Sequence, residues 1–164
     1  MFSLGILTVS DKGSQGERAD ESGMVIREVL GIYGVQVVKY GIVPDEGELI
    51  STTIVEWADK EGIDLILTTG GTGLSPRDVT PEATLAVLDR SAPGFVEAMR
   101  TESLKKTSMA MLSRAVAGIR GGSLIINLPG SPRAVREGLE VILPVLPHAI
   151  EVLRGEVGEC GETI

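Results

Sequence analysis

The chain has 164 residues, 43% of them apolar and 23% charged, which is the composition of one globular domain with a substantial core. Its formal net charge of −8, with no cluster of Lys and Arg, disfavours nucleic acid as a partner. No apolar run reaches the roughly 20 residues that cross a bilayer and no leader precedes the strand-like opening, so no membrane partner is expected. The single cysteine, Cys160, allows no internal disulfide and favours the reducing cytoplasm.

Apolar β-branched runs alternate with amphipathic stretches along the first part of the chain. We expect strands at residues 3–9, 35–43 and 64–69, and helices at residues 21–33 and 46–60. Gly34 and Gly62 are placed to end the two helices, and Pro44 is placed to end the second strand. A polar loop that contains glycine is expected at residues 10–20.

The second part of the chain carries helix-start and turn residues. Residues 80–82 (Thr-Pro-Glu) combine a capping hydroxyl, a proline for the first turn and an acid for the positive end of the helix dipole. The glycine pair at residues 121–122 separates two apolar runs and predicts a hairpin or another tight return. Ser131 begins the last long helix, which Pro144 and Pro147 should kink or divide.

Predicted strands that follow one another at about 30 residues, with helices between them, indicate a single α/β domain with a parallel sheet covered by helices. Ligands of such sheets bind at the carboxyl ends of the strands. Loops with polar, acidic or glycine residues follow the predicted strands at residues 10–11, 44–45, 68–78 and 127–132. We therefore expect these loops to converge on one ligand site. The domain is expected to span residues 1–154, followed by a flexible C-terminal tail at residues 155–164.

Two of these loops have the residues of an anion site. Residues 70–73 (Gly-Gly-Thr-Gly) leave backbone N–H groups open to a phosphate. The loop is not a Walker A motif because no Gly-Lys-Ser/Thr follows, and Pro76 stands at the third-glycine position of a dinucleotide fingerprint. Gly130 and Ser131 offer free backbone at a helix N-terminus. Taken alone, each loop is equally well explained as a turn or a helix cap.

Two acids follow predicted strands and are candidates to act together. Asp45 follows Pro44, and Asp78 lies beside Arg77 just ahead of a predicted helix. On converging loops they would hold Mg²⁺, which takes one or two carboxylates together with substrate phosphates. The alternative interpretation is that each acid caps its own loop or pairs with Arg77 on the surface.

The remaining polar residues limit the chemistry. Lys12, Arg77 and Arg114 either neutralise phosphate charge or are solvated. The lone histidine, His148, is expected to be structural, and without it no Ser-His-Asp or Cys-His set can be assembled. Covalent acyl chemistry is therefore disfavoured.

Several short blocks, in order, make the chain resemble the molybdopterin adenylyltransferases of molybdenum cofactor biosynthesis, the MogA/MoaB type. The blocks are LTVSD (7–11), PDE (44–46), TTGGTG (68–73), RDVTPEAT (77–84), APGF (92–95), MLSR (111–114) and NLPGSP (127–132). One branch of this family has the fold, lacks the PDE and RDVTP blocks and is doubtful as an adenylyltransferase. This chain has both blocks and therefore resembles the active branch.

The resemblance implies a three-layer αβα fold, a mostly parallel sheet with helices on both faces, and usually a homotrimer. It implies transfer of AMP from Mg-ATP to the terminal phosphate of molybdopterin, with release of pyrophosphate. The product would pass to a separate molybdate-inserting protein. Residues 92–120 carry more apolar side chains than one short helix face needs. The residues alone favour packing of this segment inside the monomer, whereas the resemblance implies that part of it lies at the intersubunit surface.

The resemblance also implies a role for individual residues. Asp45 and Asp78 match the catalytic acids, acting through Mg²⁺. The positions that match substrate-binding residues are Ser10, Asp11, Thr69, Gly70, Gly71, Thr72, Gly73, Ser113, Arg114, Pro129, Gly130 and Ser131. Ser113 and Arg114 match the pterin-side pair of the family.

Two other interpretations stay open from sequence. A non-catalytic molybdopterin-binding trimeric module or scaffold of the same pathway would bind without turnover, and a generic nucleotide-binding regulator would bind ATP without any pterin. Release of pyrophosphate from Mg-ATP in the presence of molybdopterin separates the enzyme from both.

Overall fold

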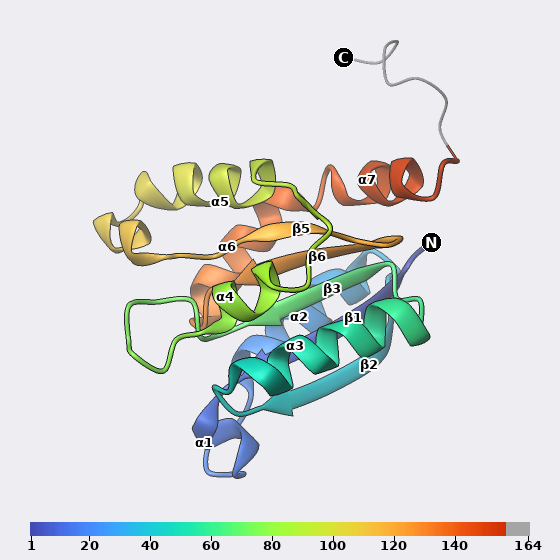
Figure 1. Cartoon of the computed structure of the whole chain (residues 1–164). Helices are drawn as coiled ribbons and strands as arrows, with labels where there is room; N and C mark the ends of the chain where they lie inside the picture. Colours follow the sequence, from blue (N-terminus) through green and yellow to red (C-terminus); the bar gives the residue numbers. More distant parts are fainter. Residues whose placement is uncertain (157–164) are drawn as a thin grey trace.

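The structure, a computed structural model, describes residues 1–156 and consists of a six-stranded sheet between two layers of helices (Figure 1). The strands are β1 Ser3–Val9, β2 Gln36–Val43, β3 Leu65–Thr69, β4 Arg90–Ser91, β5 Ala117–Arg120 and β6 Ser123–Leu128. The α-helices are α1 Asp11–Ser14, α2 Glu21–Ile32, α3 Gly47–Val55, α4 Thr80–Leu85, α5 Gly94–Leu104, α6 Pro132–Ile142 and α7 Leu146–Leu153. Two further turns are the π-helical η1 Glu56–Lys60 and the 3₁₀-helical η2 Ser108–Leu112. The predicted α/β fold of three layers is confirmed.

The strands lie in the order β2-β1-β3-β6-β5-β4 across the sheet. β2, β1, β3 and β6 run parallel, and β5 runs antiparallel to β6. The carboxyl ends of the four parallel strands therefore share an edge with the amino end of β5. The loops after β1, β2, β3 and β6 and the segment that enters β5 meet there.

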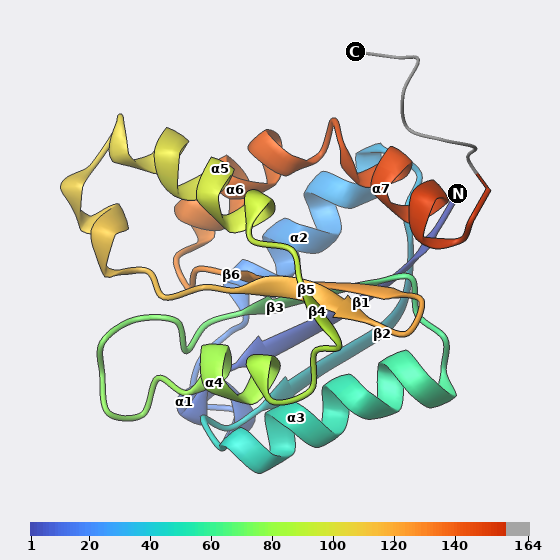
Figure 2. The same ribbon diagram turned by 45° about the horizontal axis from the view of Figure 1, so that its top comes forward.

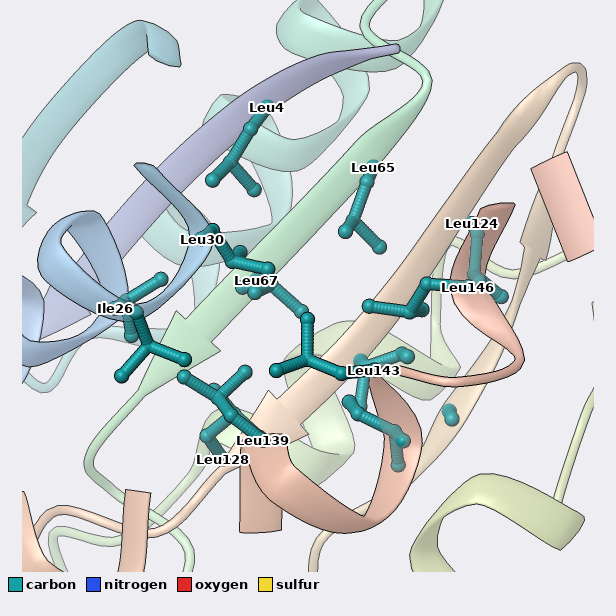
Figure 3. Close-up of a cluster of buried hydrophobic side chains, with 14 of the residues drawn as sticks. Leu4, Ile26, Leu30, Leu65, Leu67, Leu124, Leu128, Leu139, Leu143 and Leu146 are labelled. Carbon is teal, nitrogen blue, oxygen red and sulfur yellow. The ribbon is translucent and has the colours of Figure 1, made fainter. Parts of the chain in front are cut away.

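Each face of the sheet has its own hydrophobic core, because the central strands are apolar on both sides. Leu4, Leu65 and Leu124, from β1, β3 and β6, face α2 and α6, where Leu30 and Leu139 pack against them (Figure 3). α5 and α7 complete this layer, and α3 with α4 covers the opposite face (Figure 2).

The core of the α3 face is built around one aromatic ring. Trp57 of η1 packs with Leu7 and Ile66 of the sheet. Gly5 of β1 lies against this ring, and a Cβ there would be 2.7 Å from its Cε3 atom. The glycine is therefore required by the close approach of η1 to β1.

Most predicted elements are present, with small shifts at their ends. The glycine pair 121–122 forms the β5–β6 hairpin, and the last helix divides around Pro144 into α6 and α7, as predicted. The helix predicted at residues 46–60 is α3 continued by π-helical η1. No helix in residues 1–156 has the length and apolarity to traverse a bilayer.

Three expectations need correction or fall outside the structure. The loop predicted at residues 10–20 contains the short helix α1. Thr80 does not cap α4; Val79 is the N-cap, and the Thr80 hydroxyl donates instead to the carbonyl of Gly70 at 2.9 Å. The predicted tail lies outside the described residues from position 157 onward, as does Cys160.

Replacing Gly5 with valine should lower the free energy of unfolding by about 1–3 kcal/mol, because the added side chain overpacks the buried Trp57 ring. The matched control is Gly31→Ala in α2, where a Cβ meets no atom within 4 Å. Urea unfolding followed by circular dichroism measures both variants. Equal stability of Gly5→Val and wild type would contradict this packing.

Candidate functional site at the carboxyl edge of the sheet

The loop at residues 70–78, called the glycine loop below, leaves β3 in a conformation that requires glycine. Gly70 and Gly71 have φ values of +95° and +65°. A Cβ on Gly70 would lie 2.3 Å from the carbonyl oxygen of Val9, and one on Gly71 would lie 2.3 Å from the Thr80 hydroxyl. The start of α4 is bonded back onto this turn, since the Thr80 N–H donates to the Gly71 carbonyl at 3.1 Å.

Several backbone N–H groups of the glycine loop make no hydrogen bond within the described part of the protein. Within residues 1–156, the N–H groups of Gly71, Thr72 and Gly73 donate to no protein acceptor. Successive free N–H groups in a glycine-rich turn form a concave site for an anion. The predicted phosphate site thus has donors that the fold itself does not use.

Asp11 joins the loops that follow three different strands. Its Oδ1 accepts from the Asp45 N–H at 3.0 Å, and its own N–H donates to Asp45 Oδ2 at 2.9 Å. Both of its oxygens also accept from Arg77 of the glycine loop, at 2.8 and 3.0 Å. Hydrogen bonds from Arg77, followed by the bond from the Asp45 backbone, hold the pKa of Asp11 below its usual range.

Asp45 has the opposite electrostatic surroundings. Burial raises the pKa of Asp45, and the negative charges of Asp11 and Asp78 raise it further, against the lowering effect of the Asp11 N–H and the Arg77 charge. The loops therefore bring three carboxylates together with one nearby guanidinium, and a bound cation would relieve their repulsion.

Asp78 and Arg114 are fixed by the glycine loop itself. Asp78 Oδ2 accepts from the Ser75 N–H at 3.0 Å. The Arg114 guanidinium, which arrives just ahead of β5, donates to the carbonyls of Gly73 at 2.8 Å and Asp78 at 2.6 Å and pairs with Glu82. Arg77 and Arg114 thus brace the loop, and their charges are already compensated by protein groups.

Two cavities open on either side of the glycine loop. The α5 cavity, of about 800 Å³, lies between the glycine loop, α5, η2 and α6. The α1 cavity, of about 670 Å³, lies between the glycine loop, α1 and the start of α2. Gly71, Asp78 and Gly130 line both. Ligands in the two cavities would therefore meet at these three residues.

A hydrogen-bonded cluster forms one wall of the α1 cavity. Asp20 caps α2 by accepting from the Gly23 N–H at 2.9 Å, and it also accepts from Thr8 at 2.7 Å and from Tyr40. Burial and the bond to Asp20 raise the pKa of Tyr40 to about 12. The cluster holds the segment that carries Arg18, the one basic side chain lining the described α1 cavity.

The structure brings almost all predicted site residues to these cavities. Those that line a cavity are Ser10, Asp45, Thr69, Gly70, Gly71, Thr72, Gly73, Asp78, Ser113, Pro129, Gly130 and Ser131. Asp11 and Arg114, which are also predicted to contact substrate, are not among the residues lining these two cavities, and both are hydrogen-bonded to neighbouring loops.

Some cavity residues were not predicted. Arg100, Lys106 and Glu137 line the α5 cavity, and Arg18 and Asp20 line the α1 cavity. The N-cap preference of aspartate ahead of a helical run would have identified Asp20 as a structural residue. The cations of the α5 cavity have no comparable sequence pattern, because their proximity follows from the packing of α5 on α6.

The acids fit a magnesium ion rather than a metal enclosed by protein ligands. Across residues 1–156, no three His, Cys, Asp or Glu side chains form a group that would hold a metal by themselves. Mg²⁺ does not need such a group, since it is commonly bound by one or two carboxylates plus phosphate oxygens and water. Asp45 and Asp78, each lining the α1 cavity beside the free loop N–H groups, meet that requirement.

These features define a class: an α/β protein with two adjoining cavities at the carboxyl edge of its sheet, where β1 is flanked by β2 and β3 and the chain reverses its winding. Residues 5–148 match the family model described as a probable molybdopterin binding domain. The chain belongs to this family.

Individual relatives agree with the family assignment. The chain is 45% identical to a molybdopterin adenylyltransferase of Helicobacter pylori over 161 aligned residues. The alignment covers 97% of this chain and 92% of the relative. The crystal structure of the molybdopterin biosynthesis enzyme MoaB of Thermus thermophilus is 59% identical, with a TM-score of 0.90 over 94% of this chain and 98% of that one. Gephyrin of Dictyostelium discoideum is 46% identical over 163 residues, which are 93% of this chain and 23% of gephyrin.

Substitutions at two loop glycines should have different effects. Gly71→Val forces a positive-φ residue to carry a side chain 2.3 Å from Thr80 and 3.1 Å from Asp45, so both stability and ligand binding should fall. Gly130→Ala adds a methyl whose nearest neighbour is Gly70 Cα at 3.5 Å, an ordinary contact, so only ligand binding should fall. Thermal unfolding and molybdopterin titration measure the two effects. If both variants bind molybdopterin as tightly as wild type, the two loops serve only as turns and do not bind the ligand.

Neutralising Asp45 should stabilise the fold at neutral pH. The folded-state pKa of Asp45 is raised, so its ionisation costs stability above that pKa, and the cost disappears as the pH falls below its unfolded value. Asp45→Asn should therefore unfold at higher urea concentration than wild type near neutral pH, and the difference should close in acid. Glu48→Gln, an exposed charge change nearby, should show no such gain. A loss of stability in Asp45→Asn at neutral pH would contradict the assigned electrostatics.

Proposed function

We propose that the protein is a molybdopterin adenylyltransferase, which transfers AMP from Mg-ATP to the terminal phosphate of molybdopterin and releases pyrophosphate. One observation carries the proposal: two cavities meet at Gly71, Asp78 and Gly130, beside unused backbone N–H groups and a carboxylate cluster. A reaction that joins two phosphate-bearing substrates needs such a junction.

The two cavities suit different substrates. The α5 cavity combines apolar side chains such as Val96 and Met99 with the cations Arg100, Lys106 and Arg133, which suits a flat ring that carries an anionic group. The α1 cavity is polar, and Arg18 lies in its lining with Asp45 and Asp78. We assign molybdopterin to the α5 cavity and ATP to the α1 cavity.

The chemistry is an in-line displacement at the α-phosphorus of ATP. An oxygen of the molybdopterin phosphate forms the new P–O bond while the bond from the α-phosphorus to the pyrophosphate oxygen breaks. A phosphate monoester has a second pKa of about 6 and is ionised at neutral pH, so no protein base has to activate it. That agrees with a described site lined by no histidine.

The protein supplies position and charge compensation. The free N–H groups of residues 71–73 would hold phosphate oxygens at the junction, and Asp45 and Asp78 would hold Mg²⁺. When bound, the ion would neutralise the phosphate oxygens and polarise the α-phosphorus. Nucleotidyl transfer depends on such positioning more than on a protein nucleophile.

We also propose that the product passes to a separate molybdate-inserting protein. The match to gephyrin covers 23% of that chain, so a domain like this one also occurs within a longer protein.

Asp78→Asn should reduce turnover by about 100-fold or more, equivalent to about 2.7 kcal/mol of activation free energy, while molybdopterin binding is retained. The variant loses a charge at the junction but keeps an oxygen to accept from Ser75. Pyrophosphate release from Mg-ATP and molybdopterin measures turnover, and Glu48→Gln is the charge-matched control. Full activity in Asp78→Asn would remove the metal-binding role assigned to this acid.

A homotrimer is proposed whose interface includes the end of α5 and the segment that follows it. Val96 and Met99 pack inside the monomer, but Leu104, Met109, Met111 and Leu112 are exposed. Light scattering at micromolar concentration should give three times the monomer mass, and Met111→Glu should lower it because a charge would be buried at the interface. A single species of monomer mass for wild type would eliminate the trimer without affecting the catalytic proposal.

A further inference from the structure

Helix α6 presents a carboxylate to the α5 cavity that the transfer chemistry does not use. Ala134, Glu137 and Gly138 lie three and four residues apart on one face of the helix, and they line the cavity together with Ser131, the N-cap residue. Of the described residues that line this cavity, only Asp78 and Glu137 are acidic. Asp78 belongs to the junction, which leaves Glu137 to be explained.

Glu137 is held in place but retains an unused acceptor. Its side chain is 20% exposed, and its Oε1 receives Arg133 Nε at 3.1 Å and Lys106 Nζ at 3.4 Å. No described residue donates to Oε2. The hydrogen bonds from Arg133 and Lys106 lower the pKa of Glu137, so the group is an anion at neutral pH. A carboxylate accepts about four hydrogen bonds, and this one therefore has capacity to spare.

Apolar side chains line part of the same cavity. Met99 of α5 lies directly against α6, where a Cβ on Gly138 would be 3.0 Å from its Sδ, and Val96 and Leu112 also line the cavity. The glycine lets α5 approach α6 closely. A cavity with apolar side chains and a fixed acceptor in its wall suits a flat heterocycle that has N–H donors along one edge.

The donor pattern distinguishes the candidate rings. A pterin has two adjacent donors, its N3–H and its 2-amino group, which can bond together to one carboxylate. Adenine has one amino group flanked by ring nitrogens that are acceptors, so a carboxylate would repel part of that edge. The free side of Glu137 thus favours a pterin over the purine of ATP.

We propose that Glu137 determines specificity for the pterin ring by accepting hydrogen bonds from its N3–H and 2-amino group. The inference rests on the proposed function, since it assigns the pterin of molybdopterin to the α5 cavity. Glu137 contacts the substrate far along the ring from the transferred group, so it contributes to binding rather than to the chemical step.

The first test compares pterin with lumazine, in which an oxo group replaces the 2-amino group. Wild type should bind pterin more tightly than lumazine by about tenfold or more, the effect of one charge-assisted hydrogen bond. In Glu137→Gln the preference should vanish or reverse, because an amide can donate to the oxo group of lumazine. Fluorescence titration measures both ligands, and Glu140→Gln, an exposed acid of the same helix, should keep the wild-type preference.

A purely structural Glu137 gives a different result. If it only braced Lys106 and Arg133, the substitution would weaken pterin and lumazine equally, and the ratio of the two affinities would stay at the wild-type value. Such an unchanged ratio would overturn the proposal, as would a wild type that binds neither ring or does not distinguish them.

A kinetic readout separates this inference from the proposed function. With molybdopterin and Mg-ATP, Glu137→Gln should raise KM for molybdopterin by about tenfold and change kcat by less than about twofold, as expected for a contact made equally in ground and transition states. Pyrophosphate release with an unchanged KM would refute only the role of Glu137. A pterin preference that depends on Glu137 without any pyrophosphate release would refute only the transferase.

Discussion

Asp11 fixes the relative positions of loops that leave three different strands. It exchanges two hydrogen bonds with the backbone and side chain of Asp45, and both of its oxygens receive Arg77. Burial, together with the negative charges of Asp11 and Asp78, raises the pKa of Asp45, and the charge of Arg77 offsets this only in part. Asp11 therefore both fixes the loops at this edge and adds to the negative charge around Asp45 that a bound cation would relieve.

Two further contacts complete the junction. Thr80 bonds the start of α4 onto the glycine turn, and Arg114 bonds the carbonyls of the same loop from the β5 side. The carbonyls are thus used by the protein, whereas the N–H groups of residues 71–73 are left free. In a protein with a net charge of −8, this local excess of donors, together with the cations lining the α5 cavity, would favour the binding of a phosphate group at this edge.

The sequence predicted the parts of the site that depend on strand ends. Gly71 and Asp45 follow predicted strands, and the rule that ligands bind at carboxyl edges places them together. The sequence could not predict the role of Asp11, because it depends on a side-chain pair with Arg77, 66 residues away. It could not predict the role of Glu137 either, because that role depends on the packing of α5 against α6. Thr80 was misassigned as a cap because its capping propensity is local, whereas its actual partner, the Gly70 carbonyl, is set by the turn.

Adenylyl transfer at the junction is tested most directly by the fate of a label on the α-phosphate of ATP. Incubation of wild type with this ATP, Mg²⁺ and molybdopterin should place the label on molybdopterin and leave the released pyrophosphate unlabelled. Omitting molybdopterin should abolish pyrophosphate release. Label that stays in ATP, or leaves as free AMP regardless of molybdopterin, would contradict adenylyl transfer by this site.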